Sequence, residues 1–183
     1  HADEYVAQTF IELGKPVVAP LEIWAEKLIH EQITHLERDD SKTQDLSVSN
    51  GEHTLRVVLY PVHQGKSIDN NVPLIFTPEG MSFSQTGDQS NTEDFAWIDK
   101  VSQSYSVDVL MPNCWTTDIT RMIDGFEPEL VITGHENELG HSVDHREPYW
   151  MTYDLLRGSS APFVMLTWGE SFVFKNMDSI AAE

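Results

Sequence analysis

The spacing of apolar residues changes along the chain, and this change limits the folds open to it. Over residues 3–13 and 21–36 the apolar positions recur with helical spacing. A middle region then alternates apolar and polar residues, as strands joined by short turns do. Its predicted strands are residues 45–48, 53–60, 72–77 and 81–86.

After this middle region, helical segments alternate with short apolar strands. The predicted helices are residues 92–102, 117–123 and 148–156. The predicted strands here are residues 107–111, 129–133 and 162–166, and a further short strand, residues 16–20, lies between the two N-terminal helices. A run of antiparallel strands followed by alternating helices and strands predicts an α/β fold with a mixed sheet, built in layers.

The composition excludes several classes of partner. Of 183 residues, 11 are basic and 30 acidic, which gives a net charge of −19. So few cations argue against binding to nucleic acid or to an anionic membrane surface. No apolar run approaches the ~20 residues that a membrane span needs. The single cysteine, Cys114, excludes a disulfide framework within the chain and follows a predicted buried strand, so we expect an inert thiol.

Four polar clusters lie beside predicted strands or helices, where a rigid scaffold fixes side-chain positions. They are His1-Ala2-Asp3-Glu4, His63, Gly87-Asp88, and the segment 134–138 with His135. Each cluster alone has an ordinary explanation, such as a turn or a surface histidine. Imidazole and carboxylate groups together suit zinc, iron or manganese, so the joint pattern predicts a metal centre.

The order of these clusters resembles that of the metallo-β-lactamase superfamily of metal-dependent hydrolases. That family has a His-x-His-x-Asp-His motif, then a His, a Gly-Asp and a late Gly-His. Here His-Ala-Asp-Glu at 1–4, Tyr-Pro-Val-His at 60–63, Gly-Asp at 87–88 and Thr-Gly-His at 133–135 are similar to the successive motifs. The resemblance implies a metallo-β-lactamase-like αββα sandwich, of which this chain would form the second half plus the end of the first.

The resemblance also implies a ligand set for one or two divalent metal ions, which would be zinc, iron or manganese. His1 and His63 would belong to one site, and Asp88 would bridge to a second site. The second site would hold Asp3, Glu4 and His135. Asp3 would act as the catalytic residue that orients the water or takes its proton. A metal-bound hydroxide would then attack an ester, lactone or phosphodiester, the small-molecule substrate.

Two departures from the family pattern carry expectations of their own. Glu4 stands where the family has a histidine, and the family's first histidine would precede residue 1. We therefore expect residues 1–183 to form a single domain that lacks its N-terminal strands. Apolar side chains on the inner side of the sheet would then need a cover, supplied by the missing N-terminal half or by a homodimer partner.

Several residues near the last cluster have secondary roles in this interpretation. Glu138 and His141 are candidates for groups that orient the ligands, because they follow His135 by three and six residues. We do not expect His141 or His145 to bind metal directly, since they lie beyond the loop that presents His135.

Two alternatives to a hydrolase stay open. The chain could be a non-catalytic metallo-β-lactamase-like domain with a structural or binding role, if the departure at Glu4 abolishes turnover. It could also carry copper on the amine and imidazole of His1 as a mature N-terminus, in an oxidative enzyme. The helical segments and the single cysteine argue against this last class, which is typically a disulfide-bonded β-sandwich.

Overall fold

The computed structural model describes residues 9–20 and 33–174. Its main feature is a seven-stranded sheet in the order β3-β4-β5-β6-β7-β8-β9. The strands are β3 (Gln44–Ser49), β4 (Thr54–Gln64), β5 (Ile68–Phe76), β6 (Ser82–Gln85), β7 (Val109–Met111), β8 (Leu130–Ile132) and β9 (Phe163–Val164). Neighbours from β3 to β6 are antiparallel and those from β6 to β9 are parallel, which confirms the predicted mixed sheet.

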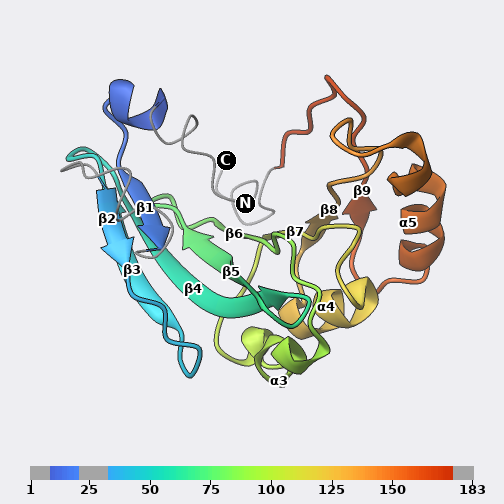
Figure 1. Ribbon diagram of the computed structural model, residues 1–183, viewed down its shortest axis with the longest axis horizontal. Helices are drawn as coiled ribbons and strands as arrows, with labels where there is room; N and C mark the ends of the chain where they lie inside the picture. Colours follow the sequence, from blue (N-terminus) through green and yellow to red (C-terminus); the bar gives the residue numbers. More distant parts are fainter. Residues whose placement is uncertain (1–8, 21–32, 175–183) are drawn as a thin grey trace, which may run out of the picture.

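Short helices connect the parallel strands (Figure 1). They are η1 (Thr92–Asp94), α3 (Phe95–Ile98), η2 (Val101–Gln103), α4 (Ile119–Phe126), η3 (Val143–His145) and α5 (Tyr149–Leu156). The predicted helix over residues 92–102 is therefore a series of short helical turns. In α4, Asp118 caps the first turn by accepting a hydrogen bond from the Arg121 backbone N–H.

Alternate residues of β4 and β5 supply one side of the core, since successive side chains of a strand point to opposite faces. Val58, Val62 and Leu74 are fully buried there, against the equally buried side chains of Phe95, Ile98, Met122, Ile123 and Phe126. Helices α3 and α4 approach so closely that a Cβ on Gly125 would lie 2.4 Å from the Ile98 carbonyl oxygen. This packing explains why a glycine stands inside a helix.

A separate parallel pair, β1 (Val17–Pro20) and β2 (Ile33–Leu36), lies at the β3 end of the molecule in Figure 1. Strand β1 matches the prediction, and residues 9–12 are helical as expected. The predicted helix over 21–36 is wrong at its end, because residues 33–36 pair as a strand. The rest of that prediction, and residues 1–8, lie outside the described residues.

The topology brings the ends of β6, β7 and β8 to one edge of the sheet, since these three strands are parallel neighbours. Asp88 follows β6, Asn113 follows β7 and His135 follows β8. An isolated bridge between Asn113 and Gly134 continues the pairing beyond the last two strands. Loops at the carboxyl ends of parallel strands are where α/β sheets place their sites.

Candidate metal centre

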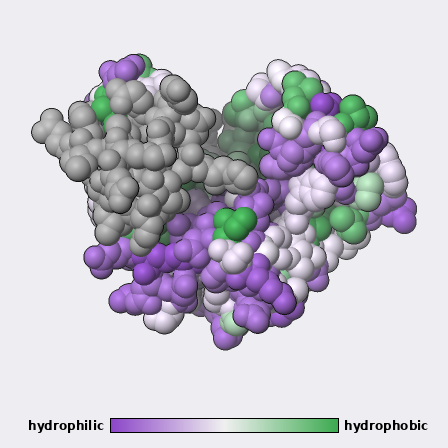
Figure 2. Space-filling model, viewed as in Figure 1, coloured by the Kyte–Doolittle hydropathy of each residue, from purple (hydrophilic) through white to green (hydrophobic). Residues whose placement is uncertain are grey.

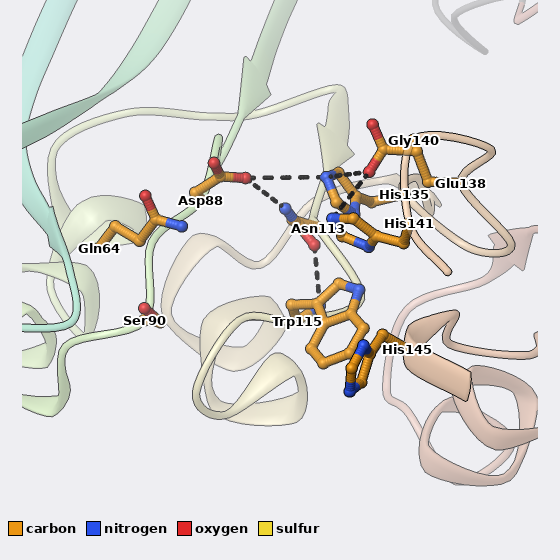
Figure 3. A pocket seen from close by; sticks show the side chains of 10 residues that line it. All are labelled: Gln64, Asp88, Ser90, Asn113, Trp115, His135, Glu138, Gly140, His141 and His145. Carbon is orange, nitrogen blue, oxygen red and sulfur yellow. Dashed lines mark hydrogen bonds and ion pairs between the residues drawn. The ribbon is translucent and has the colours of Figure 1, made fainter. Parts of the chain in front are cut away.

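A cavity of about 880 Å³ opens at this edge of the sheet. Its lining joins the end of β4 with the loops after β6, β7 and β8 (Figure 3). The lining residues are Gln64, Asp88, Ser90, Asn113, Trp115, His135, Glu138, Gly140, His141 and His145. Three imidazoles and two carboxylates therefore face one hollow.

Asp88 and His135, two of the ligands that the sequence resemblance implies, lie close together in this cavity. Asp88 Oδ1 lies 3.9 Å from His135 Nε2. Asn113 Nδ2 donates a 3.0 Å hydrogen bond to the same oxygen of Asp88. The loop that carries Asp88 begins at Gly87, whose φ of 54° favours glycine, and a Cβ there would lie 2.9 Å from Asn70 Nδ2.

His135 itself has a backbone conformation that is costly for a residue with a side chain. Its φ is 77°, and that of Asn137 is 49°. Such a conformation costs roughly 1–3 kcal/mol and persists where the surroundings impose it. The strain presents the imidazole to the cavity, where His135 Nε2 lies 2.9 Å from Glu138 Oε2.

Glu138 and His141 join this pair from the same loop. His141 Nε2 lies 3.7 Å from Glu138 Oε2, and the rings of His135 and His141 are 5.5 Å apart. In Figure 3, Asp88 lies on one side of His135, and Glu138 lies on the other. His145 is placed differently, beside Trp115, with its Nδ1 3.0 Å from Ser142 Oγ.

His63 is not among the residues that line the cavity, although the next residue, Gln64, is. It lies inside β4 rather than in a loop after a strand ending at residue 60, which corrects the predicted end of that strand. Its Nδ1 is 3.0 Å from Asp94 Oδ1, and its backbone N–H donates to Asp94 Oδ2 at 3.0 Å. Its Nε2 lies 3.4 Å from Arg38 Nη2.

Asp94 belongs to a buried polar network that the sequence did not indicate. Only 5% of Asp94 is exposed, and it also accepts a hydrogen bond of 3.1 Å from Gln89 Nε2. Gln89 is fully buried and accepts from Thr116 Oγ1 at 2.6 Å. Neither residue stands in a recognisable motif, and only the position of Gln89 directly after the Gly-Asp pair associates it with the site.

His1, Asp3 and Glu4 lie outside the described residues, so the structure does not place the remaining predicted ligands. Cys114 is buried beside the site, and burial together with the charge of Glu136 raises its pKa to about 12. The expectation of an inert thiol is therefore supported. Within the described residues, no helix is long and apolar enough to cross a membrane.

Comparison with known proteins gives a consistent result at the level of fold. No family model matches the sequence, and neither does any curated protein. A metallo hydrolase from the archaeon Ignicoccus hospitalis is similar in structure, with a TM-score of 0.67 at 20% identity over 96% of this chain and 78% of its own. A Thermotoga maritima protein assigned to the metallo-β-lactamase superfamily as a zinc-dependent hydrolase gives a TM-score of 0.49 at 14% identity, over 82% of this chain and 84% of its own.

The topology agrees with the order of elements predicted from the sequence. The mixed sheet ends in parallel strands, and polar loops follow β6 and β8. The chain thus shares its fold with the Ignicoccus metallo hydrolase.

Proposed function

We propose that the chain is a metal-dependent hydrolase whose centre lies at the ends of β6 and β8. The observation that carries the proposal is the approach of Asp88 Oδ1 to within 3.9 Å of His135 Nε2 in a cavity large enough for a small molecule. The fold supports it, because the similar Ignicoccus protein is a metallo hydrolase.

The donors at this site fit a divalent cation. Imidazole and carboxylate groups suit zinc, iron or manganese. Glu138 Oε2 and His135 Nδ1 are buried atoms that make no hydrogen bond of good geometry within the protein. Buried polar atoms normally form hydrogen bonds, whereas this Glu138 oxygen faces the imidazoles of His135 and His141, so it fits a site that is completed by an ion.

In this proposal Asp88 and His135 hold the cation, and His1, Asp3 and Glu4 contribute as the sequence resemblance implies. His63, which the resemblance also implies, pairs instead with Asp94 and Arg38. A bound divalent cation lowers the pKa of a water and polarises a carbonyl or phosphoryl oxygen. Asn113 keeps the Asp88 carboxylate turned toward His135 through its hydrogen bond. Asp3 would take or orient the proton of the water, as inferred from the sequence alone.

The substrate would enter against the cavity wall made by Trp115, Gln64 and Ser90. Trp115 is 45% exposed and offers a flat apolar surface. Gln64 and Ser90 offer polar groups opposite it (Figure 3). Such a mixed wall suits a small ester, lactone or phosphodiester with one apolar part.

Hydrolysis by the metal-loaded protein tests the proposal. The purified full chain is stripped with chelator and reloaded with Zn²⁺ or Mn²⁺. It is then assayed on p-nitrophenyl acetate, δ-valerolactone and bis(p-nitrophenyl) phosphate. We expect metal-dependent turnover of at least one substrate, and its loss in Asp88→Asn.

The matched control is Asp154→Asn, because that carboxylate lies on α5 with Arg157 as its partner, 3.6 Å away. This variant should keep full activity. Metal binding without turnover of any substrate class would contradict the proposal and favour a non-catalytic binding domain.

A further inference from the structure

We propose that Glu138 and His141 bind the divalent cation directly, together with His135. The loop from residue 134 to residue 141 would then supply three ligands by itself. The inference rests on the proposed function only in taking a divalent cation as the ligand. It departs from the sequence interpretation, in which Glu138 and His141 orient the ligands without touching the ion.

The distances among the three side chains suit a shared ion. Their candidate ligand atoms all lie within 4.8 Å of one another. Ligand atoms around a tetrahedral Zn²⁺, each about 2.0–2.1 Å from the metal, are separated by roughly 3.3 Å. Glu138 Oε2 lies 2.9 Å from His135 Nε2 and 3.7 Å from His141 Nε2, on either side of that value. Small side-chain rotations would therefore close the set around one ion.

The position of Glu138 around the His135 ring separates a ligand from an orienting group. A carboxylate that orients a metal-bound histidine holds the ring nitrogen that faces away from the metal. Here Glu138 Oε2 and Asp88 Oδ1 both approach Nε2, at 2.9 and 3.9 Å, whereas Nδ1 is buried without a hydrogen-bond partner. Glu138 therefore contacts the ring nitrogen that also faces Asp88, and not Nδ1, which an orienting carboxylate would hold if Nε2 bound the ion.

The loop is held in shape independently of any ion. The Asn137 backbone N–H donates to the Glu147 carbonyl oxygen at 2.9 Å, which closes the loop. The His141 N–H donates to the Glu138 carbonyl oxygen at 3.2 Å, and Arg146 Nε donates to the His141 carbonyl oxygen at 3.0 Å.

The side chain of His141 packs against the ring of Trp115. The ring of Trp115 meets the ring of His141 edge to face, with centroids 6.1 Å apart. Ligands that are placed in advance lose less freedom on binding, so this arrangement favours a site on the loop.

Direct ligation is observable by magnetic resonance. The full chain is labelled with ¹⁵N-histidine and loaded with ¹¹³Cd²⁺ as the probe, and couplings between cadmium and ring nitrogens are recorded. We expect a coupling that disappears in His141→Ala and stays in His145→Ala. His145 is the matched control, because it lines the same cavity but pairs with Ser142. A spectrum of the loaded protein without a coupling from His141 would overturn the assignment.

Glu138 is tested by Glu138→Gln, with Glu147→Gln as a control outside the 134–141 loop. We expect Glu138→Gln to weaken Zn²⁺ binding at least tenfold and to shift the ¹¹³Cd resonance, because an oxygen ligand is replaced. Glu147→Gln should change neither. An unchanged ¹¹³Cd resonance in Glu138→Gln would leave Glu138 an orienting group and refute direct ligation.

These measurements use no substrate, so they separate the two proposals. Couplings from His141 in a protein that hydrolyses nothing would refute the proposed function and leave this inference standing. Turnover that depends on Asp88 in a protein without those couplings would do the reverse.

Discussion

His63 and His135 occupy equivalent places in the sequence argument, yet their surroundings in the structure are opposite. His63 lies in a long strand, and all its polar groups have partners: Nδ1 and the backbone N–H meet Asp94, and Nε2 meets Arg38. His135 lies in a loop with positive φ, and its Nε2 faces the carboxylates of Glu138 and Asp88, which can bind a cation together with it. One histidine is committed to the fold, while the other retains capacity for a ligand.

The partners of His63 also determine which nitrogen carries its proton. A guanidinium has no acceptor, so Arg38 must donate to Nε2 and Nδ1–H must donate to Asp94. This is the tautomer that a metal at Nε2 would need, but Arg38 occupies that position here. A histidine in the right motif position can therefore bind an ion only where its hydrogen-bond partners leave a ring nitrogen open to it.

The largest effect that we expect is on metal affinity. His135→Gly should weaken Zn²⁺ binding at least a hundredfold, because His135 belongs to every ligand set that the site supports. His63→Ala should weaken it much less. Calorimetric titration of the folded proteins measures both, with His145→Ala as control. Equal losses in the two variants would break the comparison and return His63 to the metal centre, as the resemblance implies.

The next effect is on the free energy of unfolding, and we expect it to be larger near His63 than near His135. Asp94→Ala should lower the free energy of unfolding by about 2 kcal/mol, because buried donors of His63 and Gln89 lose their acceptor. Urea unfolding in the presence of chelator measures it.

Glu138→Ala is the matched variant in the loop region, where the carboxylate is 44% exposed. It should change stability by less than about 0.5 kcal/mol, as exposed substitutions do. A larger loss of stability in Glu138→Ala than in Asp94→Ala would show that the fold depends more on the His135 loop than on the network around His63.

These contrasts show how far the sequence predicts this molecule. The mixed sheet and its element order were predictable, because apolar periodicity is local. The positions of Asp88 and His135 were predictable too, since each follows a strand directly. The pairing of His63 with Arg38 and Asp94 was not predictable, because these residues lie 25 and 31 positions from His63 in the sequence.

The expectation of a single domain 1–183, covered by a missing N-terminal half or by a homodimer partner, stays a prediction. So does the membership of His1, Asp3 and Glu4 in the centre. The acidic surface is consistent with the charge of −19, and hydrophilic side chains cover much of the face in Figure 2.

A smaller effect tests whether His135 is strained for its function. Glycine adopts a φ of 77° without steric cost, so His135→Gly should stabilise the metal-free protein by about 1 kcal/mol. Asn137→Gly is the control, and its gain should be smaller, because asparagine tolerates positive φ. Urea unfolding with chelator present gives both values. A less stable His135→Gly protein would show that the imidazole contributes to folding, as that of His63 does.

The smallest effect concerns Cys114, which borders the His135 loop through the hydrogen bond from its N–H to the Gly134 carbonyl oxygen. Burial raises the pKa of this thiol to about 12, against an ordinary value of about 8.5. The unfolded chain therefore releases the thiol proton at lower pH than the folded chain does. The free energy of unfolding therefore falls as the pH rises from about 9 toward 12. Below about pH 9 the thiol is protonated in both states, so Cys114 then causes no change of stability with pH.

Cys114→Ala removes this contribution, so the variant should lose less stability than the wild type between pH 8 and pH 10, as measured by urea midpoints. Iodoacetamide at pH 8 should alkylate the native thiol at least a hundredfold more slowly than the unfolded one, because both burial and protonation protect it. Rapid native alkylation would mean that the loop carrying His135 opens to solvent. His63 and His135 would then differ in mobility, and not only in whether their ring nitrogens have hydrogen-bond partners.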